Sequence, residues 1–327
     1  MSDTEQVDPD PDQALVPAKK RPGRPRKKID NVAYKINGIV DKPTHDENLL
    51  EMVYDNPRIF KKIFTLFRGY TSNEVMIKFD KIGCVFITKG HLQQTTQIAK
   101  IRGKLLNHYY CKEDIKICVR CDELEKIFCS FDRTHYRITF VLKEDYRSTL
   151  HIFVRDDDMD KIDHYEIELI SRSSDLETAL LDDSKYPLKF KFPSRHFKTQ
   201  IRDISSLCHI FSFTKNETEP LAITYEVKNS LKFFSQYTNK EKIDLQSTLD
   251  PNDILTVSVK VALVKPFSNA CIGDTVYISC DKLQPICFMT ELDEKKTDQD
   301  DDAGAEGNPK YVCEIKVFTE ISMADKS

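Results

Sequence analysis

The chain has 327 residues, of which 40% are hydrophobic and 31% are charged, and its formal net charge at pH 7 is -4. A chain of this length and apolar content can bury a sizeable core, which we expect to be divided between two domains. No stretch approaches the roughly 20 apolar residues that cross a bilayer, and the acidic start lacks the basic-then-apolar order of a signal peptide. We therefore expect a soluble intracellular protein with no membrane partner.

Residues 1–47 are predicted to form a flexible arm, because they hold five acids before residue 19, then seven Lys or Arg up to residue 28, and few large apolar side chains. Within the arm, Pro22-Gly23-Arg24-Pro25 resembles an AT-hook, whose extended core lies in the narrow minor groove of A·T-rich DNA. The residues of the arm that would contact DNA are Arg21, Gly23, Arg24, Pro25, Arg26, Lys27 and Lys28. The alternative is a nuclear-localisation signal or a nonspecific basic tail.

A first domain is expected over residues 48–170, and its first helix over residues 55–68. Successive helical residues are rotated by about 100°, which divides this segment into an apolar face and a basic face. The apolar face consists of Ile59, Phe60, Ile63, Phe64, Leu66 and Phe67. The basic face consists of Arg58, Lys61, Lys62 and Arg68. Since the whole chain is acidic, a face made almost only of cations indicates an anionic partner.

The remainder of the first domain alternates apolar runs with turns, which is typical of an antiparallel sheet. A second helix is expected over residues 122–133, with Lys126 and Arg133 on its polar side. The predicted strands are Val75–Phe79, Cys84–Thr88, Thr96–Arg102, Arg137–Leu142, Leu150–Arg155 and His164–Ile170.

After a polar connector at residues 171–185, the same pattern restarts in a second domain over residues 186–320. Its first helix, residues 193–204, places Phe197 and Ile201 opposite Lys198 and Arg202. A last helix follows the strand Ile254–Val259 and carries Lys260 and Lys265. Residues 293–309 are acidic and are expected to form a solvated loop. Residues 321–327 are expected to form a tail. The chain therefore repeats one kind of domain.

Several segments resemble, in order and spacing, the landmarks of the sliding-clamp family of proliferating cell nuclear antigen. They are Ile63–Phe67, Tyr109–Cys111, Asp122–Ile127, Asp163–Glu166, Phe197 with Ile201–Ser205, Leu231–Phe233, Thr275-Val276 and Pro285. The resemblance is closest to the clamp-like proteins of large cytoplasmic DNA viruses of the asfarvirus type, whose arm is similar to Arg21–Lys28 here. The acidic loop at 293–309 is longer than the family norm.

The resemblance implies an α+β fold of two similar clamp domains, each with two helices packed on antiparallel sheets. It further implies that the chain closes into a ring around double-stranded DNA, as a processivity factor. The residues that would line the ring are Lys61, Lys62, Arg68, Lys126, Arg133, Lys198, Arg202, Lys260 and Lys265. They would contact phosphates without reading bases. The alternative is that these charges merely solvate an outer helix face.

The resemblance also implies a homotrimer whose subunits pair through sheet edges. The strand around Leu150, Ile152 and Val154 would be the edge of the first domain, and would meet Leu231 and Phe233 of a neighbouring second domain. The alternative is that both strands are internal strands of a monomer. DNA polymerase and other replication or repair enzymes would dock through short hydrophobic peptides. Their pocket would be formed by Leu176, Leu180, Leu181 and Pro285, although connector leucines can also simply hold a linker on its own domain.

Catalytic and metal-binding motifs are sparse, so we expect neither an enzyme nor a cofactor. Cys118 and Cys121 form a single CxxC pair near Cys129 and His135, which favours packed thiols over a metal site. We expect the ten cysteines to form no disulfides, and the acidic run Asp156–Asp160 to be a solvated turn. Two alternatives remain: a non-ring DNA-binding protein, either a monomeric processivity factor or an AT-hook architectural or transcription protein, and a nuclease using Asp156–Asp160. The expected location is the host nucleus or a cytoplasmic viral replication factory.

Overall fold

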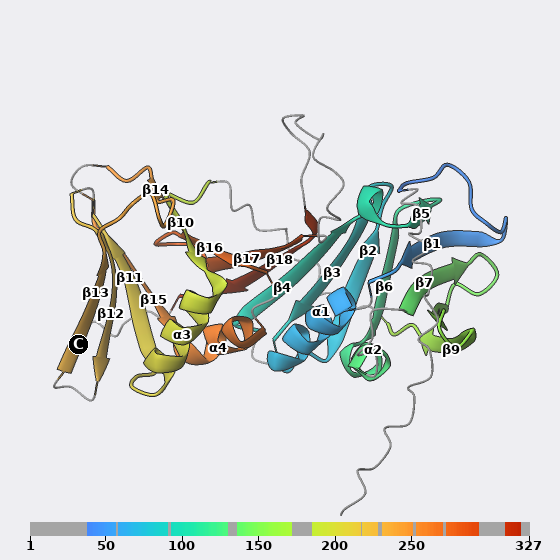
Figure 1. Cartoon of the computed structure of the whole chain (residues 1–327), viewed down its shortest axis with the longest axis horizontal. Helices are drawn as coiled ribbons and strands as arrows, with labels where there is room; N and C mark the ends of the chain where they lie inside the picture. Colours follow the sequence, from blue (N-terminus) through green and yellow to red (C-terminus); the bar gives the residue numbers. More distant parts are fainter. Residues whose placement is uncertain are drawn as a thin grey trace, which may run out of the picture. The chain divides into compact units, whose positions relative to one another are not determined.

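Figure 1 shows the computed structural model of the chain. It describes residues 38–56, 58–90, 93–129, 136–171, 185–216, 218–227, 231–250, 253–270, 273–293 and 311–321. The described residues form four α-helices and eighteen strands arranged in three antiparallel sheets. Among them, no helix is long and apolar enough to cross a membrane.

The first half of the chain contributes a five-stranded sheet. In spatial order its strands are β5 (His108–Cys111), β1 (Asn48–Tyr54), β7 (Tyr136–Lys143), β8 (Thr149–Asp156) and β9 (Lys161–Glu168). Side chains alternate between the two faces along each strand, as in β7, where Ile138 and Phe140 are fully buried and Thr139 is partly exposed. The sheet therefore has one face in the core and one face toward solvent.

A nine-stranded sheet joins the two halves of the chain. Its order is β14 (Gln246–Ser247), β10 (Leu188–Pro193), β16 (Thr275–Cys280), β17 (Ile286–Asp293), β18 (Tyr311–Thr319), β4 (Thr95–Arg102), β3 (Gly83–Lys89), β2 (Glu74–Phe79) and β6 (Ile115–Arg120). The junction is the antiparallel pair of β18 with β4, in register from Cys313 opposite Ile101 to Thr319 opposite Thr95. The two halves thus share one continuous hydrogen-bonded sheet.

The second half ends in a four-stranded sheet. Its order is β13 (Leu231–Tyr237), β12 (Leu221–Val227), β11 (Ile210–Lys215) and β15 (Leu255–Lys260). The division into domains at residues 171–185 stays a prediction, because residues 172–184 lie outside the described part of the chain.

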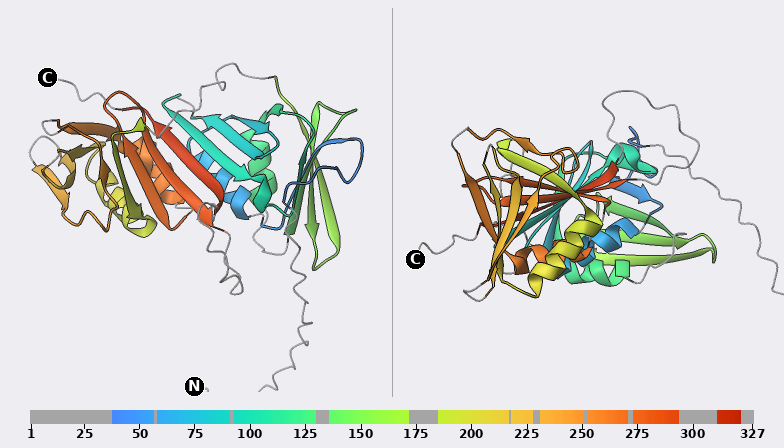
Figure 2. Two further views of the ribbon diagram at one scale, coloured as in Figure 1. Left: turned by 90° about the horizontal axis from the view of Figure 1, so that it is seen from above. Right: turned by 60° about the vertical axis from the view of Figure 1, so that its left-hand side comes forward.

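Four helices lie in a row along one face of the sheets, in the order α3 (Ser194–Ser205), α4 (Val261–Ala270), α1 (Arg58–Gly69) and α2 (Cys121–Cys129) (Figures 1 and 2). The helix expected over 55–68 begins at Arg58, and the one expected over 193–204 is displaced by a single residue. Aromatic side chains fill the space under α1 and α2. Phe60 and Phe64 each stack on Phe128 with ring centroids 5.2 Å apart.

The contact between α1 and α4 connects the helix pairs of the two halves. The Tyr70 hydroxyl, just after α1, donates a hydrogen bond to the Leu263 carbonyl oxygen at 2.9 Å. Gly69 lies so close to α4 that a Cβ atom added there would be 3.1 Å from Cβ of Pro266. The missing side chain at Gly69 therefore allows the two helices to approach each other.

Candidate functional site

The polar face of α1 is the most cationic surface of the helix row. The helix contains Arg58, Lys61, Lys62 and Arg68 and no acidic residue. Its apolar face, from Ile59 to Phe67, is buried as the sequence predicts. Burial and the nearby Arg58 lower the pKa of Lys62 below its ordinary value. Burial is the larger of the two causes, and the repulsion between neighbouring cations adds to it.

The polar face of α3 is also basic. Arg195, Lys198 and Arg202 are exposed, while Phe197 and Ile201 are buried. The Lys198 ammonium lies 3.4 Å from the Asn269 carbonyl oxygen on α4, and Arg202 lies 3.3 Å from the neighbouring Asp203. Both contacts are solvent-exposed and therefore weak, so these side chains can turn toward a ligand.

The polar face of α2 differs from those of α1 and α3. It carries Asp122, Glu123 and Glu125 against one lysine, Lys126. Glu125 pairs with Arg68 of α1, and Asp122 pairs with Lys126 at 3.0 Å. Two of the predicted ring-lining cations, Arg68 and Lys126, are thus engaged by acids of the chain itself, and the polar face of α2 is net acidic.

The remaining predicted lining residues fall into two groups. Lys260, the last residue of β15, and Lys265 on α4 are both exposed. Arg133 lies outside the described residues, as do all seven predicted DNA-contacting residues of the arm. The structure thus places Lys61, Lys62, Lys198, Arg202 and Lys265 on one helix row.

The prediction for the first sheet edge is wrong by one strand. β8, which contains Leu150, Ile152 and Val154, is hydrogen-bonded to β7 on one side and to β9 on the other, and these three side chains are buried. The regular alternation of β8 reflects one buried face of an internal strand, not a free edge. The terminal strands of this sheet are β5 and β9, and β9 is the one next to β8.

The second predicted edge strand does end its sheet. β13 pairs with β12 and is the terminal strand of the four-stranded sheet. Two aromatic side chains on it are unusually accessible, Phe233 at 37% and Phe234 at 59%. On β9, Ile162 is 60% exposed. Exposed apolar residues on the terminal strands of sheets are typical of surfaces that pair with another chain.

A second apolar cluster, the outer apolar cluster, lies on the face of the nine-stranded sheet that is turned away from the helices. It consists of Met76, Ile87, Ile98, Cys118, Tyr186, Cys287 and Phe318, with Val85, Ile170 and Met289 at its margin. In β2 the consecutive residues Val75, Met76 and Ile77 are all fully buried, which is typical of a strand covered on both faces. That continuous apolar run is the signal in the sequence that could have indicated this cluster.

Of the predicted partner pocket, Pro285 is the one residue that the structure describes, and it contacts Tyr186 of the outer apolar cluster. Pro285 is half-buried, and its carbonyl oxygen accepts a hydrogen bond from Tyr186. Leu176, Leu180 and Leu181 lie outside the described residues. However, Ile170 and Tyr186, which flank the connector on either side, both belong to the cluster or pack against it.

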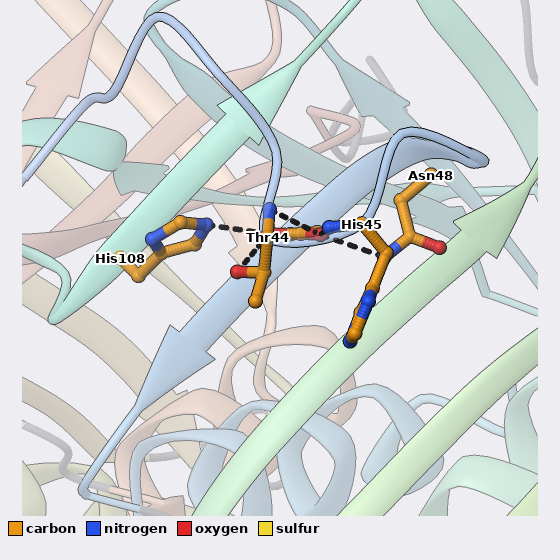
Figure 3. A network of polar contacts seen from close by, with 5 residues as sticks. Thr44, His45, Asn48 and His108 are labelled. Carbon is orange, nitrogen blue, oxygen red and sulfur yellow. Dashed lines mark hydrogen bonds and ion pairs between the residues drawn. The ribbon is translucent and has the colours of Figure 1, made fainter.

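The solvent face of the five-stranded sheet carries a buried carboxylate, Glu51, drawn in Figure 3 with its partners. It accepts hydrogen bonds from the backbone and hydroxyl of Thr44, the backbone of His45 and the amide of Asn48, and lies 2.7 Å from Nε2 of His108. A concavity of about 470 Å³ beside it is lined by Arg137, Lys143, Phe153 and Arg155, among others. No motif in the sequence points to this region.

The predicted CxxC and acidic-run features have structural roles. Cys118 belongs to the outer apolar cluster and Cys121 to the core under the helices, so the two thiols lie on opposite faces of the sheet. The nine cysteines in the described part of the chain are free thiols. Asp156 accepts hydrogen bonds from the backbone N–H groups of Asp158 and Met159, which closes a turn.

Comparison with known proteins gives a sequence match and a structural match, and no protein-family model matches the chain. The chain is 30% identical over 280 residues to an uncharacterized protein of African swine fever virus, in a Malawi tick isolate, a Kenya pig isolate and the Badajoz strain. The alignment covers 83% of this chain and 93% of the viral protein. Proliferating cellular nuclear antigen from Entamoeba histolytica matches 84% of this chain and 99% of its own, with a TM-score of 0.65 and 11% identity.

Proposed function

The chain belongs to the family of this African swine fever virus protein and has the fold of proliferating cell nuclear antigen, and we propose that it is a DNA sliding clamp. The observation that carries this proposal is the row of four helices on one face of the sheets, in which α1 and α3 present basic polar faces. A protein of net charge -4 gains nothing in solubility from concentrating cations there. A polyanion such as duplex DNA fits that surface.

The contacts to DNA would be made with phosphates. The lining would consist of Lys61, Lys62, Lys198, Arg202, Lys260 and Lys265, with Arg58 and Arg195 added from the exposed ends of α1 and α3. Long cationic side chains on helices provide positive potential without a fixed pattern of hydrogen bonds to bases. Such contacts are weak, salt-sensitive and independent of sequence, as a protein that slides requires.

The ring would be a homotrimer closed through β9 and β13. Each of these strands ends its sheet and leaves one row of backbone N–H and C=O groups without a strand partner among the described residues. Antiparallel pairing of β9 with β13 of a neighbouring copy would satisfy those groups and cover Ile162, Phe233 and Phe234. Because the two surfaces differ, the contact is head-to-tail, and repeated rotation can close it into a ring.

Replication and repair enzymes would dock on the outer apolar cluster. Short peptides with aromatic anchors bind to grooves of this chemistry. The margin residues Val85 and Met289 are only partly buried and so remain accessible to a peptide. Such a protein would act in the host nucleus or in a viral replication factory.

The test of ring closure uses a linear duplex with biotin at both ends. Protein is allowed to thread onto the DNA, streptavidin then blocks the ends, and high salt removes electrostatic binding. A clamp stays on the blocked DNA in high salt. It leaves after a restriction enzyme has cut the DNA and produced free ends. Salt-resistant retention that does not depend on the blocks, or its complete absence on blocked DNA, would contradict the proposal.

Charge-reversal variants test the lining. Changing Lys61, Lys62 and Arg202 to Glu should weaken low-salt binding to duplex DNA by about tenfold or more, because each lost phosphate contact removes released counterions. The matched control also reverses three charges, Lys42→Glu, Lys240→Glu and Lys282→Glu, since these lysines are exposed and lie outside the helix row. Equal losses in the two variants would show that only net charge matters.

The second candidate is a non-ring DNA-binding protein that works through the arm. The AT-hook-like run Pro22–Pro25 supports it. This candidate predicts binding to A·T-rich duplex that is equally strong with free and with blocked ends. The binding should disappear in high salt and should be lost when residues 1–47 are deleted. A ring retains its salt-resistant, end-dependent behaviour after the same deletion, so one experiment separates the two candidates.

A further inference from the structure

Three metal-ligating side chains converge on the solvent face of the β8–β9 hairpin. Nδ1 of His151 lies 3.1 Å from Nε2 of His164, and Oε1 of Glu166 lies 3.8 Å from the first nitrogen and 3.7 Å from the second. All three ligand atoms lie within 4.8 Å of one another. No metal site is expected from the sequence, because no two histidines stand at the spacings typical of metal motifs.

The pairing of the hairpin explains why these residues meet. In the register of β8 with β9, His151 is directly opposite Glu166, and Phe153 is directly opposite His164. His164 and Glu166 are two residues apart, so they occupy the same face of β9. Residues 13 positions apart in the sequence are therefore neighbours across the ladder, which a search for local motifs does not reveal.

The separations match those of a tetrahedral zinc site. A zinc ion bound at about 2.0–2.1 Å separates its ligand atoms by about 3.3 Å, and the three distances here lie on both sides of that value. Moving the ligands into place requires shifts of a few tenths of an ångström, which side-chain rotation supplies. The hairpin backbone can stay as it is.

The surroundings hold the imidazoles in place. The Phe153 ring stacks on His164 with centroids 4.4 Å apart and an angle of 6° between the planes. His151 is largely buried, with 12% of its side chain exposed, and among the described residues its Nε2 has no hydrogen-bond partner. Among the described residues, the polar contacts of the His151 ring therefore lie on the side where the three ligand atoms converge.

We propose that His151, His164 and Glu166 form a binding site for a divalent transition metal, with zinc as the ion that fits best. Two imidazoles and one carboxylate favour zinc over magnesium or calcium, which prefer sites made of oxygen ligands. Three protein ligands leave the fourth position to water. A bound ion would link β9, a terminal strand of its sheet, to β8 through metal–ligand bonds that add to the backbone hydrogen bonds between the two strands.

The test uses the full-length chain without a histidine tag and Zn²⁺ as the probe, in a titration against a chromogenic chelator. We expect one zinc ion per chain, and a rise of a few degrees in the melting temperature of the saturated protein, because the ion binds the folded state preferentially. His151→Ala and His164→Ala should each weaken binding by at least tenfold, and Glu166→Gln should weaken it as well. Circular dichroism shows whether each variant is folded.

His209→Ala is the matched control, because His209 is exposed and lies outside the five-stranded sheet. Substitution with Co²⁺ provides a separate readout, since thiolate ligands give strong near-ultraviolet charge-transfer bands that imidazole and carboxylate ligands do not. Absence of binding by the wild-type chain at micromolar zinc overturns the proposal. It is also overturned by equal binding in folded His151→Ala and His164→Ala, or by a thiolate spectrum.

Discussion

Glu51 is a carboxylate that is 3% exposed and stands between the apolar residues Leu50 and Met52 of β1. Burial by itself raises the pKa of this group, but hydrogen bonds from His108, Asn48 and Thr44 outweigh burial and lower the pKa to about 2. Because Thr44 and His45 precede β1, the carboxylate fixes the path of the chain as it enters the sheet. The role of Glu51 is therefore structural. The side chain also lines the concavity on the solvent face of the five-stranded sheet.

Glu51→Gln is therefore expected to destabilise the protein at neutral pH, by about 2 kcal/mol, since the glutamine carries no charge and cannot accept the same hydrogen bonds. A carboxyl group whose pKa is lower in the folded state contributes stability that is fully present above its ordinary value of 4.5 and is lost as pH falls toward 2. The difference in unfolding free energy between wild type and variant should therefore shrink below pH 4.5, as measured by urea denaturation.

Glu113→Gln is the control for this prediction, because Glu113 is about half exposed in its pair with Arg147. Exposed pairs contribute little, so the control should change stability by less than about 0.5 kcal/mol. A Glu51→Gln effect that is the same at about pH 3 as at neutral pH would contradict the assignment of a low pKa.

At the scale of elements, the proposed association of copies of the chain depends on two of the terminal strands, β9 and β13. β9 and β13 each end a sheet, and Figure 1 draws them at opposite ends of the described structure. β13 exposes Phe233 and Phe234 on its two faces. A terminal strand that exposes two aromatic side chains is an aggregation hazard in a monomer. This supports pairing of β13 with a strand of another chain in solution.

Phe233→Asp with Phe234→Asp should convert the assembly into single chains. We expect light scattering of the wild type at micromolar concentration to give three times the chain mass of 38.0 kDa, and the variant to give that mass once. Tyr146→Asp is the control, since this tyrosine is 63% exposed in the loop between β7 and β8. A wild-type protein that already has the mass of one chain would remove the ring from consideration.

The predicted strands agree closely with the observed ones wherever turn residues delimit an alternating run. The segment expected at Val75–Phe79 is observed as Glu74–Phe79, and the one expected at Arg137–Leu142 as Tyr136–Lys143. By contrast, β9 begins three residues before its predicted start at His164. Alternation indicates that a strand has one buried face, but it does not indicate which strands are its neighbours. For that reason the prediction of β8 as an edge is wrong, and the meeting of His151 with Glu166 could not be predicted.

At the scale of the whole molecule, the nine-stranded sheet separates two chemically different faces. The helix row covers one face and the outer apolar cluster lies on the other. The helices α1 and α3 could be predicted from the sequence, because amphipathic spacing is local, whereas their place on one common surface could be expected only from the resemblance. The outer apolar cluster could not be predicted from the sequence, because its residues come from strands of both halves and meet only through the pair of β18 with β4.

We predict that a partner peptide on the outer apolar cluster also uses the leucines of the connector. Leu180→Glu with Leu181→Glu should then abolish pull-down of the cognate DNA polymerase, while the mass in solution stays unchanged. Ile82→Glu is the control, because Ile82 is 69% exposed in the turn between β2 and β3. Undiminished pull-down by the double variant would remove these leucines from the docking site.

The net-acidic polar face of α2 has a consequence for a ring of three such chains. Each subunit would present one cationic arc, formed by α3, α4 and α1, followed by a gap at α2. α2 packs in the same half as β9, the proposed joint. The duplex would then sit in a potential with threefold periodicity, most positive along α3, α4 and α1 of each subunit and least positive at α2. On the β9 side of a seam, opening the ring to admit DNA would therefore break few contacts with phosphate.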